Sequence, residues 1–354
     1  MRLTAKLALA ATAAAAILGP ASAASAVSVS QVASSSVIAA QGPNHSLIFY
    51  WQTIGTVPWH PEVVAGPGVA WSAPSVARVG TSSVIAVEGP NHSLLFFWQT
   101  IGTVPWHGEV VAGPGTTYSA PSVTQVGSSS VIAAEGPLHS LAFYWQTIGT
   151  VPWHPELVAP FWSTFSAPSV AWVGSSSVIA AQGPADSLLF YWQTIGTVPW
   201  HPELVAPSGT AHSAPSVAQV GSSSVIAVEG RVHSLLFFWQ TIGTVPWHPE
   251  LVAPFFSTFS APSVAWVGSS SVIAAQGPAH SLAFYWQTIG TVPWNPEVAA
   301  PFGTTLGAPT VAQVGSSSVI AVQGGSASLR FYWQTIGTVP WNPELVAGPG
   351  TTFA

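Results

Sequence analysis

Apolar residues along the chain are gathered in short runs separated by Gly, Pro, Ser and Asn, with four runs in every stretch of 47 residues. Runs of β-branched and aromatic residues that are this short, and that Gly and Pro interrupt so regularly, predict β-strands rather than helices. In residues 72–118 the predicted strands are Ser75–Val79, Val84–Glu88, Leu94–Thr100 and Glu109–Ala112.

The third predicted strand is apolar on both faces. Leu94, Phe96 and Trp98 alternate with Leu95 and Phe97, so each face of the strand carries large side chains. A strand that is apolar on both faces is buried on both faces. We therefore expect each sheet to be packed between two neighbouring sheets.

The segment from Phe49 to Trp59 recurs seven times, and its first tryptophan returns at a constant interval of 47 residues with no insertion. Strand-rich repeats of this length predict a β-propeller with one blade per unit. The fold class is therefore all-β, a seven-bladed β-propeller with four antiparallel strands per blade. An open β-solenoid is the alternative, but a whole number of units favours a closed ring, whose means of closure stays open. The predicted single domain spans residues 24–354, with units 25–71, 72–118, 119–165, 166–212, 213–259, 260–306 and 307–353.

The N-terminus has the pattern of a secretory signal peptide. A basic start with Arg2 and Lys6 precedes an apolar run over residues 7–18 and a small-residue cleavage site. We predict residues 1–23 to be the signal peptide, with cleavage after Ala23 and with Ala26 as the alternative. The apolar run is shorter than the ~20 residues that span a bilayer. The mature protein is thus expected to be secreted and extracellular, without insertion into a membrane.

The charge of the chain excludes several classes of partner. Only 5% of the residues are charged and the formal net charge is −6, which becomes −8 without Arg2 and Lys6. Binding of nucleic acid requires clustered Lys and Arg, so the sequence argues against it. Because the chain has no cysteine, its stability must come from apolar burial rather than from disulfides. The low charge and the many aromatic residues leave self-association open.

Catalysis is disfavoured because the polar residues repeat in every unit. The chain has one aspartate, Asp186, and one regular column of acids at the position of Glu62. Acids on neighbouring blades are separated by about the ~10 Å between packed sheets, whereas a retaining glycosidase needs its carboxyl groups ~5–5.5 Å apart. Histidines one blade apart, such as His60 and His107, cannot share a zinc ion either. We therefore predict no enzyme activity, no metal site and no cofactor.

The unit resembles the blades of bacterial seven-bladed propeller lectins of the Photorhabdus type. The matching pattern is Pro74, an apolar strand over 84–88, Ser93-Leu94 with Trp98-Gln99 four residues later, and Pro105-Trp106. The resemblance covers the whole predicted mature chain and implies binding of fucose or related sugars. Two departures affect specificity: a Pro-Asn-His turn replaces the usual Asp-Gly turn, and Glu109 stands where a second Trp is common.

The candidate sugar site lies in the loop between the third and fourth predicted strands. Sugar binding needs an aromatic face beside a few directed hydrogen-bonding groups, and this loop offers Trp, His and Glu within four residues. The tryptophan either packs or contacts ligand, whereas the mid-strand Trp51 and its counterparts are expected to pack between blades. The Glu column has an alternative structural role, as an acceptor for N–H groups of the loop. The candidate residues are Trp59, His60, Glu62, Trp106, His107, Glu109, Trp153, His154, Glu156, Trp200, His201, Glu203, Trp247, His248, Glu250, Trp294, Asn295, Glu297, Trp341, Asn342 and Glu344.

Differences between the units are concentrated at a second surface, formed by the turn after the second strand and the connection to the next blade. Both segments are expected on one face of the disc. The sequence thus supports a secreted, multivalent lectin that binds glycans or glycoconjugates, or alternatively a protein-interaction or adhesion scaffold that uses this variable face. A glycoside hydrolase is the third and weakest hypothesis. The connections end in Trp71, Tyr118, Phe165, His212, Phe259, Leu306 and Phe353.

Overall fold

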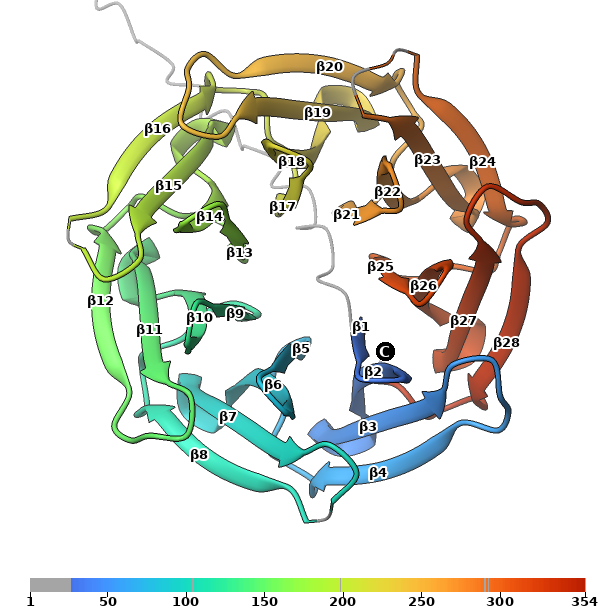
Figure 1. Cartoon of the computed structure of the whole chain (residues 1–354), viewed down its shortest axis with the longest axis horizontal. Coiled ribbons are helices and arrows are strands. Elements are labelled where there is room, and N and C mark those ends of the chain that lie inside the picture. Colours follow the sequence, from blue (N-terminus) through green and yellow to red (C-terminus); the bar gives the residue numbers. More distant parts are fainter. Residues whose placement is uncertain (1–26, 104, 198, 290, 292, 354) are drawn as a thin grey trace, which may run out of the picture.

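The protein is a ring of seven four-stranded antiparallel sheets around a central axis, as the computed structural model shows (Figure 1). The structure describes residues 27–353 apart from residues 104, 198, 290 and 292. The predicted signal peptide lies outside the described residues. Within the described residues, no helix is long and apolar enough to cross a membrane.

Each sheet consists of four consecutive strands, and we number the blades 1 to 7 along the chain. The innermost strands are β1 (Val27–Val32), β5 (Ser75–Val79), β9 (Ser122–Val126), β13 (Ser169–Val173), β17 (Ser216–Val220), β21 (Ser263–Val267) and β25 (Thr310–Val314). The second strands are β2 (Ser35–Gly42), β6 (Ser82–Gly89), β10 (Ser129–Glu135), β14 (Ser176–Gln182), β18 (Ser223–Gly230), β22 (Ser270–Gln276) and β26 (Ser317–Gly324). The third strands are β3 (Ser46–Thr53), β7 (Ser93–Thr100), β11 (Leu141–Thr147), β15 (Leu188–Thr194), β19 (Ser234–Thr241), β23 (Leu282–Thr288) and β27 (Ser328–Thr335). The outermost strands are β4 (His60–Ala65), β8 (His107–Ala112), β12 (His154–Ala159), β16 (His201–Ala206), β20 (His248–Ala253), β24 (Asn295–Ala300) and β28 (Asn342–Ala347).

The predicted propeller, with seven blades of four antiparallel strands, is confirmed. In blade 2 the predicted first strand, Ser75–Val79, has the observed bounds, and the other three predicted strands fall inside the observed β6, β7 and β8. The second strands are the most buried part of each blade: Val84, Ile85 and Ala86 are almost fully inaccessible. Apolar clusters run across the blade interfaces, so the core is distributed around the ring. Burial of both sheet faces is therefore what specifies the ring.

Ring closure uses the same contacts that join blades connected by the chain. The segment after β28 lies against blade 1, where the backbone N–H of Phe353 donates to the carbonyl of Gln41 at 2.8 Å. This repeats the bond from Trp71 N–H to the carbonyl of Glu88, which joins the first connection to blade 2. Closure between the described residues therefore uses side-chain and backbone contacts between blades, and each described sheet is built from four consecutive strands.

Two faces of the disc carry different segments. On one face, the loop between the third and fourth strands lies beside the turn between the first and second strands, where the N–H of Ile54 donates to the carbonyl of Ser34 at 2.9 Å. We call this the loop face. On the other face the turn Pro43–His45 contacts the connection to the next blade, and the N–H of Gly68 donates to the carbonyl of Asn44. We call this the turn face. It is the predicted variable surface, and the turn and connection lie together on it as expected.

Candidate functional site

A glutamate on each outermost strand joins two neighbouring blades. Glu62 on β4 accepts a hydrogen bond at Oε1 from the indole Nε1 of Trp51 in its own blade, at 2.8 Å. Its Oε2 accepts from two groups of blade 2, the amide of Gln99 and the indole Nε1 of Trp106, each at 3.0 Å. Three N–H donors therefore face the two oxygens of one carboxyl group, which accepts all three.

The same bridge closes the ring between blades 7 and 1. Glu344 on β28 accepts from Trp333 at 2.8 Å, from Gln52 at 3.1 Å and from Trp59 at 2.9 Å. Trp59 also packs edge-on against Phe331 of blade 7, with ring centroids 4.9 Å apart. The glutamates of the outermost strands thus join neighbouring blades. They accept hydrogen bonds from Trp and Gln side chains rather than from backbone N–H groups of the loop.

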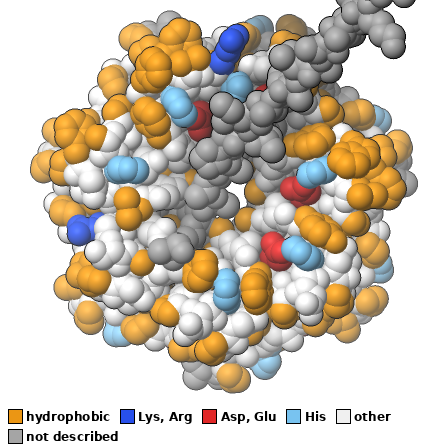
Figure 2. Space-filling view, turned by 180° about the vertical axis from the view of Figure 1, so that it is seen from behind, with side chains coloured by type: hydrophobic (Ala, Val, Ile, Leu, Met, Phe, Trp, Pro, Cys, Tyr) orange, Lys and Arg blue, Asp and Glu red, His pale blue; other side chains and the backbone are white. Residues whose placement is uncertain are grey.

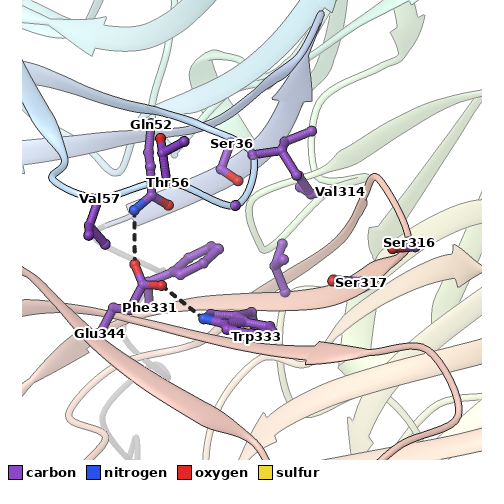
Figure 3. A pocket seen from close by; sticks show the side chains of 13 residues that line it. Ser36, Gln52, Thr56, Val57, Val314, Ser316, Ser317, Phe331, Trp333 and Glu344 are labelled. Carbon is purple, nitrogen blue, oxygen red and sulfur yellow. Dashed lines mark hydrogen bonds between the residues drawn. The ribbon is translucent and has the colours of Figure 1, made fainter.

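Pockets open on the loop face beside the glutamate bridges of four blade interfaces. Cavities of about 380, 380, 340 and 450 Å³ lie at the interfaces between blades 7 and 1, 6 and 7, 5 and 6, and 1 and 2. Figure 3 shows the first, with Trp333, Phe331 and Glu344 on one side and Gln52 and Thr56 on the other. Volumes of this size are within the range of small-molecule sites, ~300–1,000 Å³.

The pocket wall combines an indole ring with polar groups that retain hydrogen-bonding capacity. Trp333 is half-buried, and its N–H is occupied by Glu344, so its ring is available to an apolar surface. A carboxylate has about four acceptor positions, of which Glu344 uses three. Ser36 and Ser317 also line the cavity and supply hydroxyl groups. An aromatic wall with a few directed polar groups is the chemistry that binds a sugar ring.

The candidate residues from one loop point into two different interfaces. In blade 1, Trp59 turns toward the preceding blade and is 9% exposed, whereas Glu62 bonds to the following blade. The histidine stacks on the strand tryptophan of its own blade, at 4.4 Å for His60 and Trp51. The prediction that these residues bind sugar stays a prediction, but the loop does not hold its Trp, His and Glu together in one pocket.

The tryptophans of the third strands pack against the apolar clusters between blades, as expected, and they also line the pockets. Their position in the middle of a strand, between apolar residues, predicts the packing. The structure leaves them half-buried because the pocket opens where the strand approaches the loop face. Among the described residues, the tryptophans that line the four cavities are Trp51, Trp239, Trp286 and Trp333.

The histidine column differs in blades 6 and 7, as the sequence shows. In the other five blades the imidazole lies 4.2–4.4 Å from the indole of the strand tryptophan. In blade 6 the amide of Asn295 donates to the carbonyl of Trp286 instead, at 3.3 Å, and Asn342 does the same in blade 7. The histidine–tryptophan stack is therefore present in blades 1–5 and absent from blades 6 and 7. The described residues contain no group of three or more His, Asp or Glu that could hold a metal ion.

The turn face carries a second repeated cluster of an acid, a histidine and an aromatic ring. In blade 2, Nδ1 of His92 lies 2.7 Å from Oε1 of Glu88, and the imidazole stacks on Tyr118 at 4.4 Å. Blades 3 and 5 repeat this cluster, and blades 1 and 6 have Gln in place of the acid. Figure 2 shows these His and acidic side chains beside hydrophobic ones around the centre of this face.

Burial raises the pKa of Glu88, Glu135 and Glu229, and the hydrogen bond from the adjacent histidine partly offsets this increase. Because the folded pKa lies above the ordinary value of 4.5, folding favours the protonated acid. The free energy of unfolding should therefore fall as pH rises from 4.5 through the raised pKa values. We expect the triple variant Glu88→Gln, Glu135→Gln, Glu229→Gln to show a flatter dependence in that window.

Urea unfolding of both proteins at a series of pH values measures this difference. The natural precedents are Gln41 and Gln276, which already pair with histidines in blades 1 and 6. An equally steep fall in the triple variant would show that other groups cause the pH dependence.

Comparison with solved structures relates the ring to β-propeller lectins. The lectin BP39L from Burkholderia pseudomallei superposes with a TM-score of 0.82 at 15% identity, over 93% of this chain and 99% of that one. A six-bladed fungal lectin from Aleuria aurantia, described as having a novel fucose recognition mode, gives a TM-score of 0.57 at 13% identity, over 93% of this chain and 97% of that one. The Aleuria aurantia lectin in complex with α-methyl-L-fucoside gives 0.56 at 13% identity, over 79% of this chain and 96% of that one.

The resemblance to fucose-binding propeller lectins is thus confirmed at the level of the fold. The solved structures named above are lectins rather than enzymes. No protein family and no curated protein matches the chain by sequence.

Proposed function

We propose that this protein is a secreted, multivalent carbohydrate-binding protein whose sugar sites are the pockets between neighbouring blades. The observation that carries the proposal is the repeated cavity with an indole wall beside a carboxylate, an amide and hydroxyl groups. The shared fold with lectins that bind fucosides supports it, and makes fucose or a related sugar the first ligand to test. Secretion is supported by the signal-peptide pattern in residues 1–23.

Repetition gives such a protein a physical advantage. Weak sites displayed together on one rigid ring can gain ~10²–10⁴ in avidity on a surface that carries many copies of a glycan. Seven equivalent interfaces would place the pockets around one rim of the disc, because all of them open on the loop face. The ligand is therefore a glycan-coated surface rather than a single free sugar.

A titration with monosaccharides tests the proposal. We expect isothermal titration calorimetry with L-fucose and other methyl glycosides to show one class of weak sites with up to seven per chain. An immobilised polyvalent form of the same sugar should bind at least 100-fold more tightly. Absence of binding across a broad glycan array would reject the function. Binding with one site per chain would reject the repeated pocket as the site.

The turn face supports a second candidate, a protein-interaction or adhesion surface. Large apolar side chains are exposed there: Trp71 is 49% exposed, Tyr118 45% and Trp162 58%. Exposed aromatic residues that vary between blades are typical of surfaces that contact an asymmetric partner or another copy of the chain. Loss of cell-surface or partner binding on substitution of these residues, with sugar binding intact, would favour this function.

A further inference from the structure

Arg330 on β27 interrupts the repeat at a blade interface. It occupies a third-strand position that is apolar in every other blade: Ile48, Leu95, Ala142, Leu189, Leu236 and Ala283. At the interfaces between blades 1 and 2 and between blades 4 and 5, the leucine at this position belongs to an apolar cluster that also contains a valine of the preceding outermost strand. A cation therefore stands where the interface is otherwise apolar.

The guanidinium of Arg330 has no protein partner among the described residues. Its Nε is buried and has no hydrogen-bond acceptor there. The acid of this interface, Glu297, is occupied by Trp286, Gln334 and Trp341. Gln334 lies four residues further along the strand, ~13 Å at 3.3 Å per residue. A partly buried cation without a counter-ion is unfavourable, and buried polar groups in proteins nearly always have partners.

Several positions of this interface carry smaller residues than their counterparts in the other blades. On β24, Ala299 stands where the other six outermost strands carry Val. In the turn after β26, Gly325 replaces the Pro or Arg of the other blades, and Ser326-Ala327 replaces a turn that ends in His or Asp. A Cβ on Gly324 would lie 2.8 Å from both Cδ and Nε of Arg330, so the side chain passes directly over this glycine toward the turn face. These positions therefore carry less side-chain volume than their counterparts in the other blades.

We propose that Arg330 forms an anion-binding site between blades 6 and 7 at the turn face, specific for a carboxylate or sulfate group such as an acidic saccharide carries. A guanidinium offers donors that match the geometry of these oxyanions, and the exposed part of the side chain leaves room for them. The chain has only four arginines and one lysine, and an arginine occupies this position of the repeat in blade 7 alone. The site lies at the end of the interface opposite to the sugar pocket, so it does not depend on the proposed function.

The alternative is that Arg330 only fills the space that the small residues leave. An NMR titration of the full chain distinguishes the two, because four arginines give few ¹H–¹⁵Nε resonances. The variant Arg330→Leu assigns the resonance of Arg330 and restores the residue present at the same position of blades 2, 4 and 5. Arg78→Leu is the control, because Nε of Arg78 already donates to the carbonyl of Gly80 at 3.1 Å.

Sodium glucuronate and sodium sulfate are added in separate titrations against sodium chloride at equal ionic strength. We expect a saturable shift of the Arg330 Nε resonance with glucuronate, sulfate or both, and at least a tenfold weaker response to chloride. The effective anion identifies the ligand group. The melting temperature should rise with the same anion in the wild type and in Arg78→Leu, but not in Arg330→Leu. A response that does not saturate, that chloride reproduces, or that Arg330→Leu retains in its melting temperature would overturn the proposal.

Discussion

Replacing Glu344 by Gln is expected to open the ring between blades 7 and 1. Gln keeps one oxygen, which can still accept from Gln52 and Trp59, but its NH₂ group then faces the indole N–H of Trp333 and leaves that donor unpaired. A buried donor left unpaired costs about 1–3 kcal/mol, so we expect a loss of about 1–3 kcal/mol in the free energy of unfolding. Urea unfolding measures the loss.

The matched control is Glu62→Gln, which makes the same change in the corresponding bridge between blades 1 and 2. Those blades remain joined by the chain, whereas blades 7 and 1 are joined only by contacts such as the bond from Phe353 to Gln41. Hydrogen–deuterium exchange should therefore increase in blades 1 and 7 of Glu344→Gln and less in Glu62→Gln. Equal stability loss with evenly distributed exchange in both variants would show that closure is no weaker than any other interface.

The fold could be predicted from the sequence because the information is repeated seven times. Each short strand alone is ambiguous, but the constant spacing of Trp51, Trp98 and their counterparts leaves few arrangements that bury both faces of every sheet. The backbone conformation of the turns could not be predicted from the sequence. Trp162 and Val232 adopt left-handed backbone conformations, with φ of 63° and 56°, that their side chains disfavour. Both residues take part in hydrogen bonds between the turn and the connection to the next blade, from Trp162 N–H to the carbonyl of Leu138 and from Phe256 N–H to the carbonyl of Val232.

The site was harder to predict because it forms between units. Residues of one loop are adjacent in sequence, so the sequence predicts that Trp59, His60 and Glu62 lie together in one site. The blade geometry instead directs Trp59 backward and Glu62 forward. A signal was present: a Gln follows the strand tryptophan in every unit, as Gln52 follows Trp51, and a buried amide in an apolar strand needs a partner from a neighbour. Sequence periodicity gives the register within a blade but not the contacts across an interface.

The two tryptophan columns should have separable roles, and blades 5 and 6 provide a matched pair to show it. Trp239 and Trp294 each donate their indole N–H to Glu250 at 2.9 Å, so either substitution removes one bond from the same carboxylate. Trp239 lines the pocket, whereas Trp294 is 8% exposed and packs edge-on against Phe237. We expect Trp239→Ala to remove one sugar site and Trp294→Ala to lower stability by about 3–5 kcal/mol.

Native mass spectrometry with a saturating glycoside counts the bound sugars, and thermal melting reports stability. Trp239→Ala should reduce the maximum number of sugars by one and leave the affinity of the others unchanged, since the pockets are separate. Trp294→Ala should melt earlier but keep the full number of sites while it is folded. The reverse result, a folded Trp294→Ala that loses a site while Trp239→Ala keeps all of them, would return the sugar site to the loop tryptophans. The third-strand tryptophans would then be packing residues, and the inter-blade pockets would not be where sugar binds.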